Sequence, residues 1–285
     1  MTAEEKLRQE IKHIVPADRK SMEKAEKRWK SVGKPLFSLG KLEDAVIQIA
    51  GIKEKAVYSL DRKGLVIMCA DNGVVAEGVT QTGQEVTAIV AENFTKKETS
   101  VCLMAEVAGV DLFPVDIGMI TDVPGVTRPE YKVAYGTEDM MKGPAMTRGQ
   151  AAQAVLNGIR IVRELAGQGY DILATGEMGI GNTTTSSAVV SVLLDQDAEA
   201  VTGRGAGLSS EGLRRKIDVI RESVRLNRPD REDPLDVLSK VGGLDIAGLT
   251  GVFLGGAVCR IPVMIDGFIS SAAAVSYTHL TLPTT

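Results

Sequence analysis

Aromatic residues are scarce in this sequence, and it has no excess of positive charge. Only 4% of the 285 residues are Phe, Trp or Tyr, so the core must be built from aliphatic side chains. The formal net charge is −4 at pH 7, whereas binding to nucleic acid requires a concentrated basic surface. The composition therefore argues against a nucleic-acid partner and is otherwise ordinary for a globular protein, with 44% hydrophobic and 25% charged residues.

Cysteine is scarce as well. Cys69, Cys102 and Cys259 lie far apart, and none belongs to a C-x-x-C pair or has a histidine beside it. This spacing argues against a zinc site and against a disulfide framework, and it is typical of a protein from a reducing compartment. We therefore expect no bound metal.

A long uninterrupted apolar run is also absent. The stretch from residue 246 to 274 is apolar, but Arg260, Pro262 and Asp266 interrupt it. A buried helix followed by a buried strand explains such a stretch better than a membrane span. The first residues, MTAEEKLRQEIKHIV, are charged and contain no apolar core of a signal peptide. These features predict a cytoplasmic protein with no membrane partner.

Apolar runs alternate with helical patterns through most of the chain. The continuous apolar run at 64–70 is typical of a strand covered on both faces, and the segments at 110–118 and 170–176 are expected to be the next two strands. Helices are expected at about 85–108, from Thr147 to 165, after residue 182, from Ser209 to 226, from Pro234, and at 245–259 before a last strand at 261–268. This order predicts an α/β fold with a parallel sheet and helices on both faces, whose ligands bind at the carboxyl ends of the strands.

The two ends of the chain differ from this alternating region. Helical periodicity at Leu7–Ile14, Met22–Trp29 and Leu42–Ile49 precedes any strand, so residues 1–55 are expected to form a small helical subdomain. Residues 56–275 are then the α/β domain. The last residues, SYTHLTLPTT, break from the Ala-rich helix before them, and we expect 276–285 to be a disordered or foreign tail.

The most informative motif is GEMGIGNTTTSS at 176–187, directly after an apolar run. Its glycines allow a tight turn, and the following helix, capped by Asn182 or Thr183, would present N–H groups and hydroxyls to an anion. The residues expected to bind a nucleotide phosphate here are Gly176, Gly179, Gly181, Asn182 and Thr183. Glu177 is harder to explain in a bare turn, since a carboxylate beside an anion is costly unless it contacts a ribose hydroxyl or a cationic ring. A tight turn without a ligand remains the alternative, and Asn182 occupies the position where a P-loop requires lysine, which argues against ATP hydrolysis.

Two further stretches carry polar residues near predicted strand ends or glycine turns. Asp71 follows the first strand, and Thr82 lies on the loop after it. In TGRGAGLSSEGLRRKIDVI, Lys216 flanks the buried stripe of a helix that follows a second glycine turn. Arg214, Arg215 and Lys216 form a run of basic residues, which is ordinarily a solvated helix face. The more specific alternative is that Lys216 reaches a phosphate.

Four segments together closely resemble the nicotinate-nucleotide–dimethylbenzimidazole phosphoribosyltransferase family. They are KPLFSLGKLE, VIMCADNGVVAEGVT, LATGEMGIGNTTTSSAV and LSKVGGLDIAGLTGVFLGGA, and the resemblance covers nearly all of residues 20–275. It implies a Rossmann-like parallel sheet with a small helical domain, a homodimer, and no cofactor. The implied reaction transfers phosphoribosyl from nicotinate mononucleotide to 5,6-dimethylbenzimidazole, giving α-ribazole 5′-phosphate and nicotinate, in the synthesis of the cobamide (vitamin B12) lower ligand.

The resemblance also assigns roles to residues. It implies that Glu177 contacts substrate as a catalytic carboxylate, that Lys216 lies on the phosphate side, and that Thr82 lies near the benzimidazole, with Asp71 as a second base-binding residue. In the family the general base is a glutamate of a C-terminal RLGEG-like segment, which this sequence does not contain. We therefore expect a chain truncated at about Val275 that binds substrate weakly or is inactive. A non-catalytic nucleotide- or base-binding protein is the alternative.

Overall fold

The computed structural model describes residues 1–281 and contains one parallel sheet in that range. The strands are β1 (Lys63–Ala70), β2 (Val110–Gly118), β3 (Ile172–Met178) and β4 (Val263–Met264), in the order β2-β1-β3-β4. β1 pairs along its whole length with β2 and from Lys63 to Cys69 with β3, whereas β4 pairs only with Leu173 and Ala174. The predicted α/β fold with a parallel sheet is confirmed, and its three long strands overlap the segments predicted at 64–70, 110–118 and 170–176.

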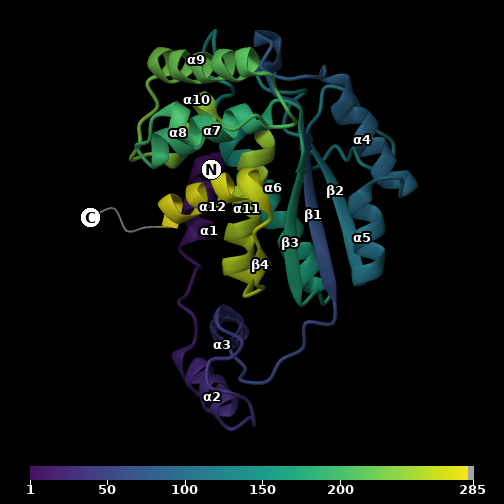
Figure 1. The fold of residues 1–285 in the computed structure, drawn as a ribbon, viewed down its shortest axis with the longest axis vertical. Coiled ribbons are helices and arrows are strands. Elements are labelled where there is room, and N and C mark those ends of the chain that lie inside the picture. Colours follow the sequence, from purple (N-terminus) through teal and green to yellow (C-terminus); the bar gives the residue numbers. More distant parts are fainter. Residues whose placement is uncertain (282–285) are drawn as a thin grey trace.

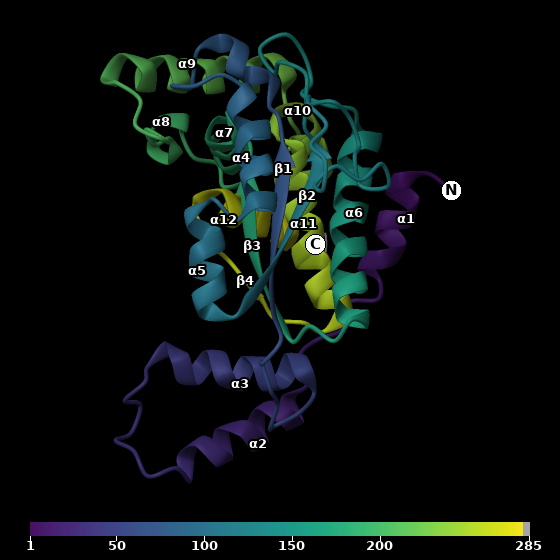
Figure 2. The same cartoon turned by 90° about the vertical axis from the view of Figure 1, so that its right-hand side faces the viewer.

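Helices cover both faces of the sheet (Figure 2). One face carries α4 (Glu85–Lys96) and α5 (Ser100–Ala108), and the other carries α6 (Arg148–Gly167) and α11 (Leu244–Cys259). The axes of α6 and α11 approach closely because glycines face each other. A Cβ on Gly158 would lie only 2.1 Å from the carbonyl oxygen of Gly248, so a larger residue would force the two helices apart.

The single helix expected at about 85–108 is in fact two helices. Lys97 adopts a left-handed conformation with φ +59°, which ends α4. Thr99 then caps α5 by accepting a hydrogen bond from the backbone N–H of Cys102. Neither Gly nor Pro marks this break, so the sequence pattern did not show it. The helix starts predicted at Thr147 and Ser209 are confirmed: Thr147 forms a capping box with Gln150, and Ser209 caps its helix through the N–H of Gly212.

The remaining helices lie beyond the β3–β4 side of the sheet (Figure 1). They are α7 (Asn182–Leu193), α8 (Ala198–Val201), α9 (Ser210–Asn227), α10 (Pro234–Val241) and α12 (Gly267–Thr281). A short 3-10 helix, η1 (Gly73–Glu77), follows β1. In residues 1–281 no helix is both long and apolar enough to cross a bilayer.

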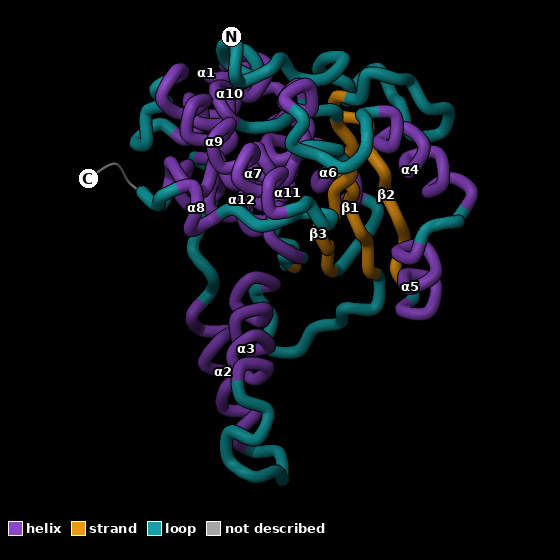
Figure 3. Tube along the Cα trace, turned by 45° about the horizontal axis from the view of Figure 1, so that its top comes forward, coloured by secondary structure: helices purple, strands orange, loops and turns teal. Residues whose placement is uncertain are grey.

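The N-terminal helices do not form the single subdomain expected for residues 1–55. α1 (Ala3–Ile11) packs on α6, where Arg148 contacts Glu4 at 3.1 Å and Arg163 contacts Glu10 at 2.8 Å. Only α2 (Arg19–Lys30) and α3 (Lys41–Lys53) project as a hairpin, at the amino-terminal end of the strands (Figure 3).

The C-terminal prediction also needs correction. The tail expected from residue 276 is helical as far as Thr281, because α12 continues through it with Ser276 fully buried. Ser276 bonds the carbonyl of Ala272 one turn earlier, so its polar group is satisfied within the helix. The predicted disorder of residues 282–285 lies outside the described residues.

Candidate active site

The glycine turn joins β3 to α7 at the carboxyl edge of the sheet, beside the end of β1. Asn72, which follows β1, donates its side-chain amide to the carbonyl of Ile180 at 3.4 Å. Thr185 of α7 donates its hydroxyl to the carbonyl of Asn182 at 3.1 Å, and the Asn72 amide oxygen lies 3.5 Å away. The strand ends expected to share one edge therefore do so.

Two of the predicted glycines are required by the geometry of the turn. Gly181 has φ +94°, a conformation that L-residues other than glycine adopt at a cost. A Cβ on Gly179 would lie 2.5 Å from the carbonyl oxygen of Ala70 and 2.6 Å from the Asp245 carboxylate. Gly176 lies within β3 rather than in the turn, where it pairs with Ile67.

The expected cap of α7 is wrong. Gly181 occupies the cap position without a side-chain hydrogen bond, and Asn182 is the first helical residue. The side chains of Asn182 and Thr183 are therefore available for other contacts. Asn182 directs its amide at two carboxylates, and Thr183 accepts a hydrogen bond from Lys216.

Glu177 and Asp245 share the side-chain amide of Asn182. Asn182 Nδ2 donates to Glu177 Oε2 and, at 3.0 Å, to Asp245 Oδ2. Asp245 is fully buried at the start of α11, and its other oxygen accepts the backbone N–H of Ile246 at 2.9 Å. The sequence analysis did not select Asp245, although it is the one charged residue in the apolar stretch at 241–259 and lies in a segment that carries the family resemblance.

Burial dominates the electrostatics of this pair. Burial, followed by the negative charge of Glu177, raises the pKa of Asp245 to about 7. Burial also raises the pKa of Glu177, which the hydrogen bond from Asn182 partly offsets. Two carboxyl groups so close in a shielded site do not both ionise readily, so near neutral pH the pair holds fewer than two negative charges.

Lys216 lies on the inner face of α9 and is only 1% exposed. Its ammonium donates to Thr183 Oγ1 at 2.7 Å and to the carbonyl of Gly203 at 3.3 Å, and it has no carboxylate partner among residues 1–281. Burial lowers the pKa of Lys216 to about 8. A buried ammonium without a counter-ion, beside the start of α7, is well suited to meet an anionic ligand.

Asp71 and Thr82, the two residues predicted to contact the benzimidazole, differ in their surroundings. Asp71 is 2% exposed, its Oδ2 accepts the N–H of Ile120 at 2.8 Å, and its Oδ1 has no partner among the described residues. Burial raises the pKa of Asp71. Thr82 is exposed on the loop, where its carbonyl accepts the hydroxyl of Thr80. The structure therefore places Asp71 at the sheet edge and leaves Thr82 outside the buried cluster.

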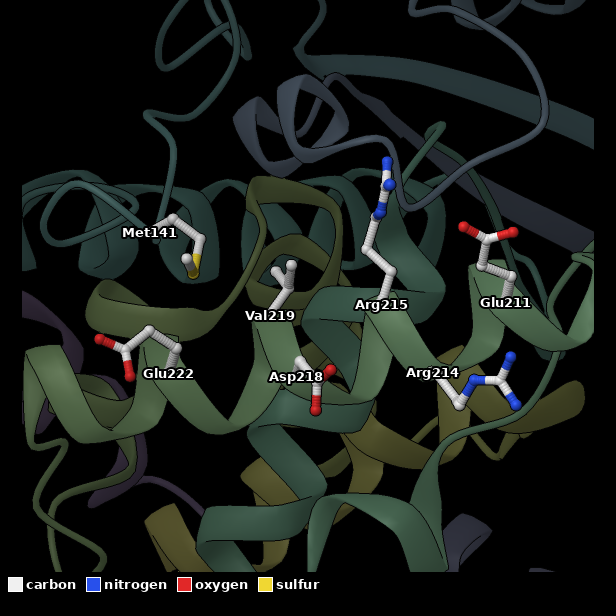
Figure 4. A pocket seen from close by; sticks show the side chains of 7 residues that line it. All are labelled: Met141, Glu211, Arg214, Arg215, Asp218, Val219 and Glu222. Carbon is white, nitrogen blue, oxygen red and sulfur yellow. The ribbon is translucent and has the colours of Figure 1, made fainter.

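A separate surface hollow lies on the outer side of α9 (Figure 4). It has a volume of about 450 Å³ and is lined by Met141, Val219 and charged side chains that include Arg214 and Arg215. The basic run thus divides: the two arginines are exposed, and Lys216 alone turns inward. Within residues 1–281, no group of three His, Cys, Asp or Glu side chains could hold a metal ion.

Comparisons with known proteins agree on one family. A family model described as "Phosphoribosyltransferase" matches residues 14–284. A nicotinate-nucleotide–dimethylbenzimidazole phosphoribosyltransferase of Acetivibrio thermocellus is 50% identical over 270 residues, which are 95% of this chain and 77% of that protein. The Escherichia coli protein of the same name is 42% identical over 94% of this chain and 75% of its own length.

A solved structure shares the fold. The crystal structure of the nicotinate-nucleotide–dimethylbenzimidazole phosphoribosyltransferase from Thermus thermophilus is 34% identical, with a TM-score of 0.84 over 92% of this chain and 78% of that chain. Because the family model extends to residue 284, the expectation that the match ends near Val275 is wrong. The match to the family therefore continues past the predicted end point, and the matched part makes up 75–78% of the length of these three relatives.

Proposed function

The chain belongs to the nicotinate-nucleotide–dimethylbenzimidazole phosphoribosyltransferase family, and from this premise we propose how its site works. It transfers phosphoribosyl from nicotinate mononucleotide to 5,6-dimethylbenzimidazole, in the synthesis of the cobamide lower ligand. The bond from the ribose C1′ to the nicotinate ring nitrogen breaks, and a bond from C1′ to a benzimidazole nitrogen forms. The electron pair of the broken bond neutralises the pyridinium, and the lone pair of the unprotonated benzimidazole nitrogen forms the new bond. The N–H proton of the other benzimidazole nitrogen is released to water.

The observation that carries this proposal is the buried, uncompensated ammonium of Lys216 beside the glycine turn. Lys216 Nζ lies 2.7 Å from Thr183 Oγ1, so a phosphate here would meet a cation and a hydroxyl together. Gly205, at φ +56°, would place a Cβ 3.0 Å from that hydroxyl and 3.6 Å from the ammonium, so the loop must stay small there. We assign the 5′-phosphate to Lys216 and Thr183, with the turn at Gly179, Gly181 and Asn182 holding the nucleotide.

Glu177 is the proposed catalytic carboxylate. It is half-buried near the carboxyl end of β3, and its negative charge would stabilise the positive charge that develops on the ribose as nicotinate departs. Because Asn182 donates to it from a fixed helix start, Glu177 is held in place before substrate binds. Gly176 precedes it in the strand and supports that backbone position.

Asp71 is the proposed contact for the benzimidazole. Its unpartnered Oδ1 is the kind of buried polar atom that a ring N–H can satisfy. Thr82, exposed on the loop after η1, would reach the base only if that loop folds over the ligand, and we keep it as the second base-binding residue. No organic or metal cofactor enters this proposal.

A binding function without catalysis is the second candidate. The sequence contains no RLGEG-like segment, the expected source of the base that removes the benzimidazole proton. A chain that binds nicotinate mononucleotide without turning it over would fit this observation.

We also propose that the chain forms a homodimer. The hairpin of α2 and α3 exposes apolar side chains around its tip, including Leu36 at 79% and Phe37 at 76% exposure. A second apolar group lies on α5, where Met104 and Val107 are exposed. Apolar surfaces of this kind are typical of contacts between subunits. Sedimentation velocity tests this, with Phe37→Ser expected to shift the chain toward the monomer.

We propose a cytoplasmic location because all three cysteines are free, as is typical of proteins in a reducing compartment. Fractionation of the native cells, with the chain detected by antibody, tests it.

The decisive experiment mixes the purified chain with nicotinate mononucleotide and 5,6-dimethylbenzimidazole and follows nicotinate and α-ribazole 5′-phosphate by chromatography. Equal amounts of both products establish the transfer. Binding of nicotinate mononucleotide without either product supports the binding function, and no binding at all contradicts both candidates. Lys216→Met serves as the control that removes the proposed phosphate contact.

A further inference from the structure

We propose that Asp245 is a positioning residue for Glu177, which acts through the side-chain amide of Asn182. The geometry makes this connection direct. The two hydrogens of one amide nitrogen are divided between Glu177 Oε2 and Asp245 Oδ2, the latter at 3.0 Å. Asp245 therefore decides which way the amide faces, and the amide in turn fixes Glu177. The inference rests on the proposed function only in giving Glu177 its contact with substrate.

Asp245 itself has almost no freedom to move. Its Oδ1 accepts the N–H of Ile246 at 2.9 Å. A Cβ on Gly243 would come within 2.4 Å of Oδ1, and one on Gly179 within 2.6 Å of Oδ2. The backbone can pack this tightly around the carboxylate because both positions are glycine, and the close packing leaves the Asp245 side chain room for one orientation.

Asn182 is equally constrained at its backbone. As the first residue of α7, it donates its N–H to the carbonyl of Gly179 at 3.1 Å. Its side chain can then adopt few rotamers, and one of them joins both carboxylates. Glu177 is partly exposed while Asp245 is fully buried, so only Glu177 can reach a ligand and Asp245 must act through the amide.

The charges around Asp245 make the arrangement sensitive to pH. Glu177 faces it from β3 and Cys69 from β1, Asp266 acts on Glu177 from the surface, and no cation contributes among the described residues. Burial and the charge of Glu177 raise the pKa of Asp245 to about 7. Below this pH a neutral Asp245 accepts from Asn182; above it an ionised Asp245 shares that amide with Glu177.

The test observes the side-chain amide of Asn182 by ¹H–¹⁵N NMR, without any need for turnover. In the unsubstituted chain, the Asn182 side-chain cross-peak should move with a midpoint near pH 7. In Asp245→Asn, which keeps an acceptor but cannot ionise, this movement should vanish. In Glu177→Gln, the midpoint should fall by about one pH unit or more, since the neighbouring negative charge is gone. Asp218→Asn, which removes an exposed carboxylate of α9 that does not act on either member of the pair, is the matched control and should leave the midpoint in place.

Binding measurements then separate positioning from simple packing. Asp245→Ala removes the acceptor and should weaken binding of nicotinate mononucleotide by up to about tenfold at pH 6, as expected for the loss of one hydrogen bond between neutral groups. Asp245→Asn should restore most of that affinity at the same pH. Failure of the asparagine variant to restore binding while it folds normally would overturn the proposal.

Each remaining outcome is decisive. A cross-peak that stays still between pH 6 and pH 8 in the unsubstituted chain would refute the coupling, whether or not any variant folds. If Asp245→Asn fails to fold, the unsubstituted chain and Glu177→Gln carry the test. A cross-peak that titrates as expected but ignores added nicotinate mononucleotide would uphold the positioning and contradict the proposed function.

Discussion

Replacing Lys216 by methionine should make the ligand-free chain more stable while it destroys the proposed phosphate contact. The lysine is 1% exposed and has no carboxylate partner among residues 1–281, so its positive charge is buried without compensation. Methionine has nearly the same length and no charge, so it can fill the same space. A residue that weakens the fold in this way is expected where function requires it.

The magnitude follows from the pKa. Burial lowers the pKa of Lys216 from 10.5 to about 8. Each pH unit is worth ~1.4 kcal/mol, so the buried charge disfavours the fold by up to about 3 kcal/mol below pH 8. Because the pKa is lowered on folding, this penalty is present at neutral pH and disappears as the pH rises from 8 to 10.5. Loss of the hydrogen bond to Thr183 costs about 1 kcal/mol, which leaves a net gain of about 2 kcal/mol for Lys216→Met at pH 7.

Urea unfolding at pH 7 and at pH 10 measures this directly. The variant should exceed the unsubstituted chain at pH 7, and the difference should shrink or reverse at pH 10. Lys24→Met, on the exposed face of α2, is the control and should change little at either pH. With nicotinate mononucleotide at pH 7, the unsubstituted chain should gain stability and Lys216→Met should not. A variant less stable than the unsubstituted chain at pH 7 without ligand would refute the reasoning.

Three further predictions concern the same edge of the sheet. The pKa of Asp245 is raised from 3.8 to about 7, so the stability that this residue contributes when protonated is lost as the pH rises from 4 to 7. Across that range, urea unfolding should show Asp245→Asn gaining up to about 4 kcal/mol in unfolding free energy over the unsubstituted chain. Parallel pH curves for the two proteins would contradict this. Glu177→Gln should lower turnover about 100-fold or more with a melting temperature within about 3 °C of the unsubstituted chain, and equal losses of both would make Glu177 structural. Gly179→Ala should cost about 1–3 kcal/mol in thermal unfolding because its Cβ would lie 2.5 Å from the Ala70 carbonyl, whereas Gly143→Ala, with open space around it, should be neutral; similar values for both would show that the turn can relax.

Local patterns in the sequence predicted most of the fold. The apolar run at 64–70 became β1 because a strand covered on both faces needs apolar residues at nearly every position, whereas 110–118 became the edge strand β2, in which Asp111 is exposed. Thr147 and Ser209 began helices because their hydroxyls accept backbone N–H groups that would otherwise be unpaired. These outcomes depend on residues within a few positions of each other. The break at Lys97 was missed since a left-handed residue other than glycine leaves little trace in composition.

The site was predicted in part. The glycine turn and Asp71 were both expected at the carboxyl edge of the sheet, and the turn, Glu177 and Asp71 lie there. Lys216 could be proposed from the family resemblance, but the sequence alone did not show that it is buried while Arg214 and Arg215 are exposed. That choice depends on which face of α9 meets α7, and it follows from tertiary packing.

The sequence by itself thus determined the parallel α/β architecture, the glycine turn that follows β3, and the family to which the chain belongs. Only the tertiary structure brought Asp245 to Asn182, 63 positions away, and closed two glycines around its carboxylate. The physical reason is that strands and caps are fixed by short-range hydrogen bonding and burial, whereas the charge state of a buried carboxyl depends on groups that meet only when the whole sheet and its helices have packed.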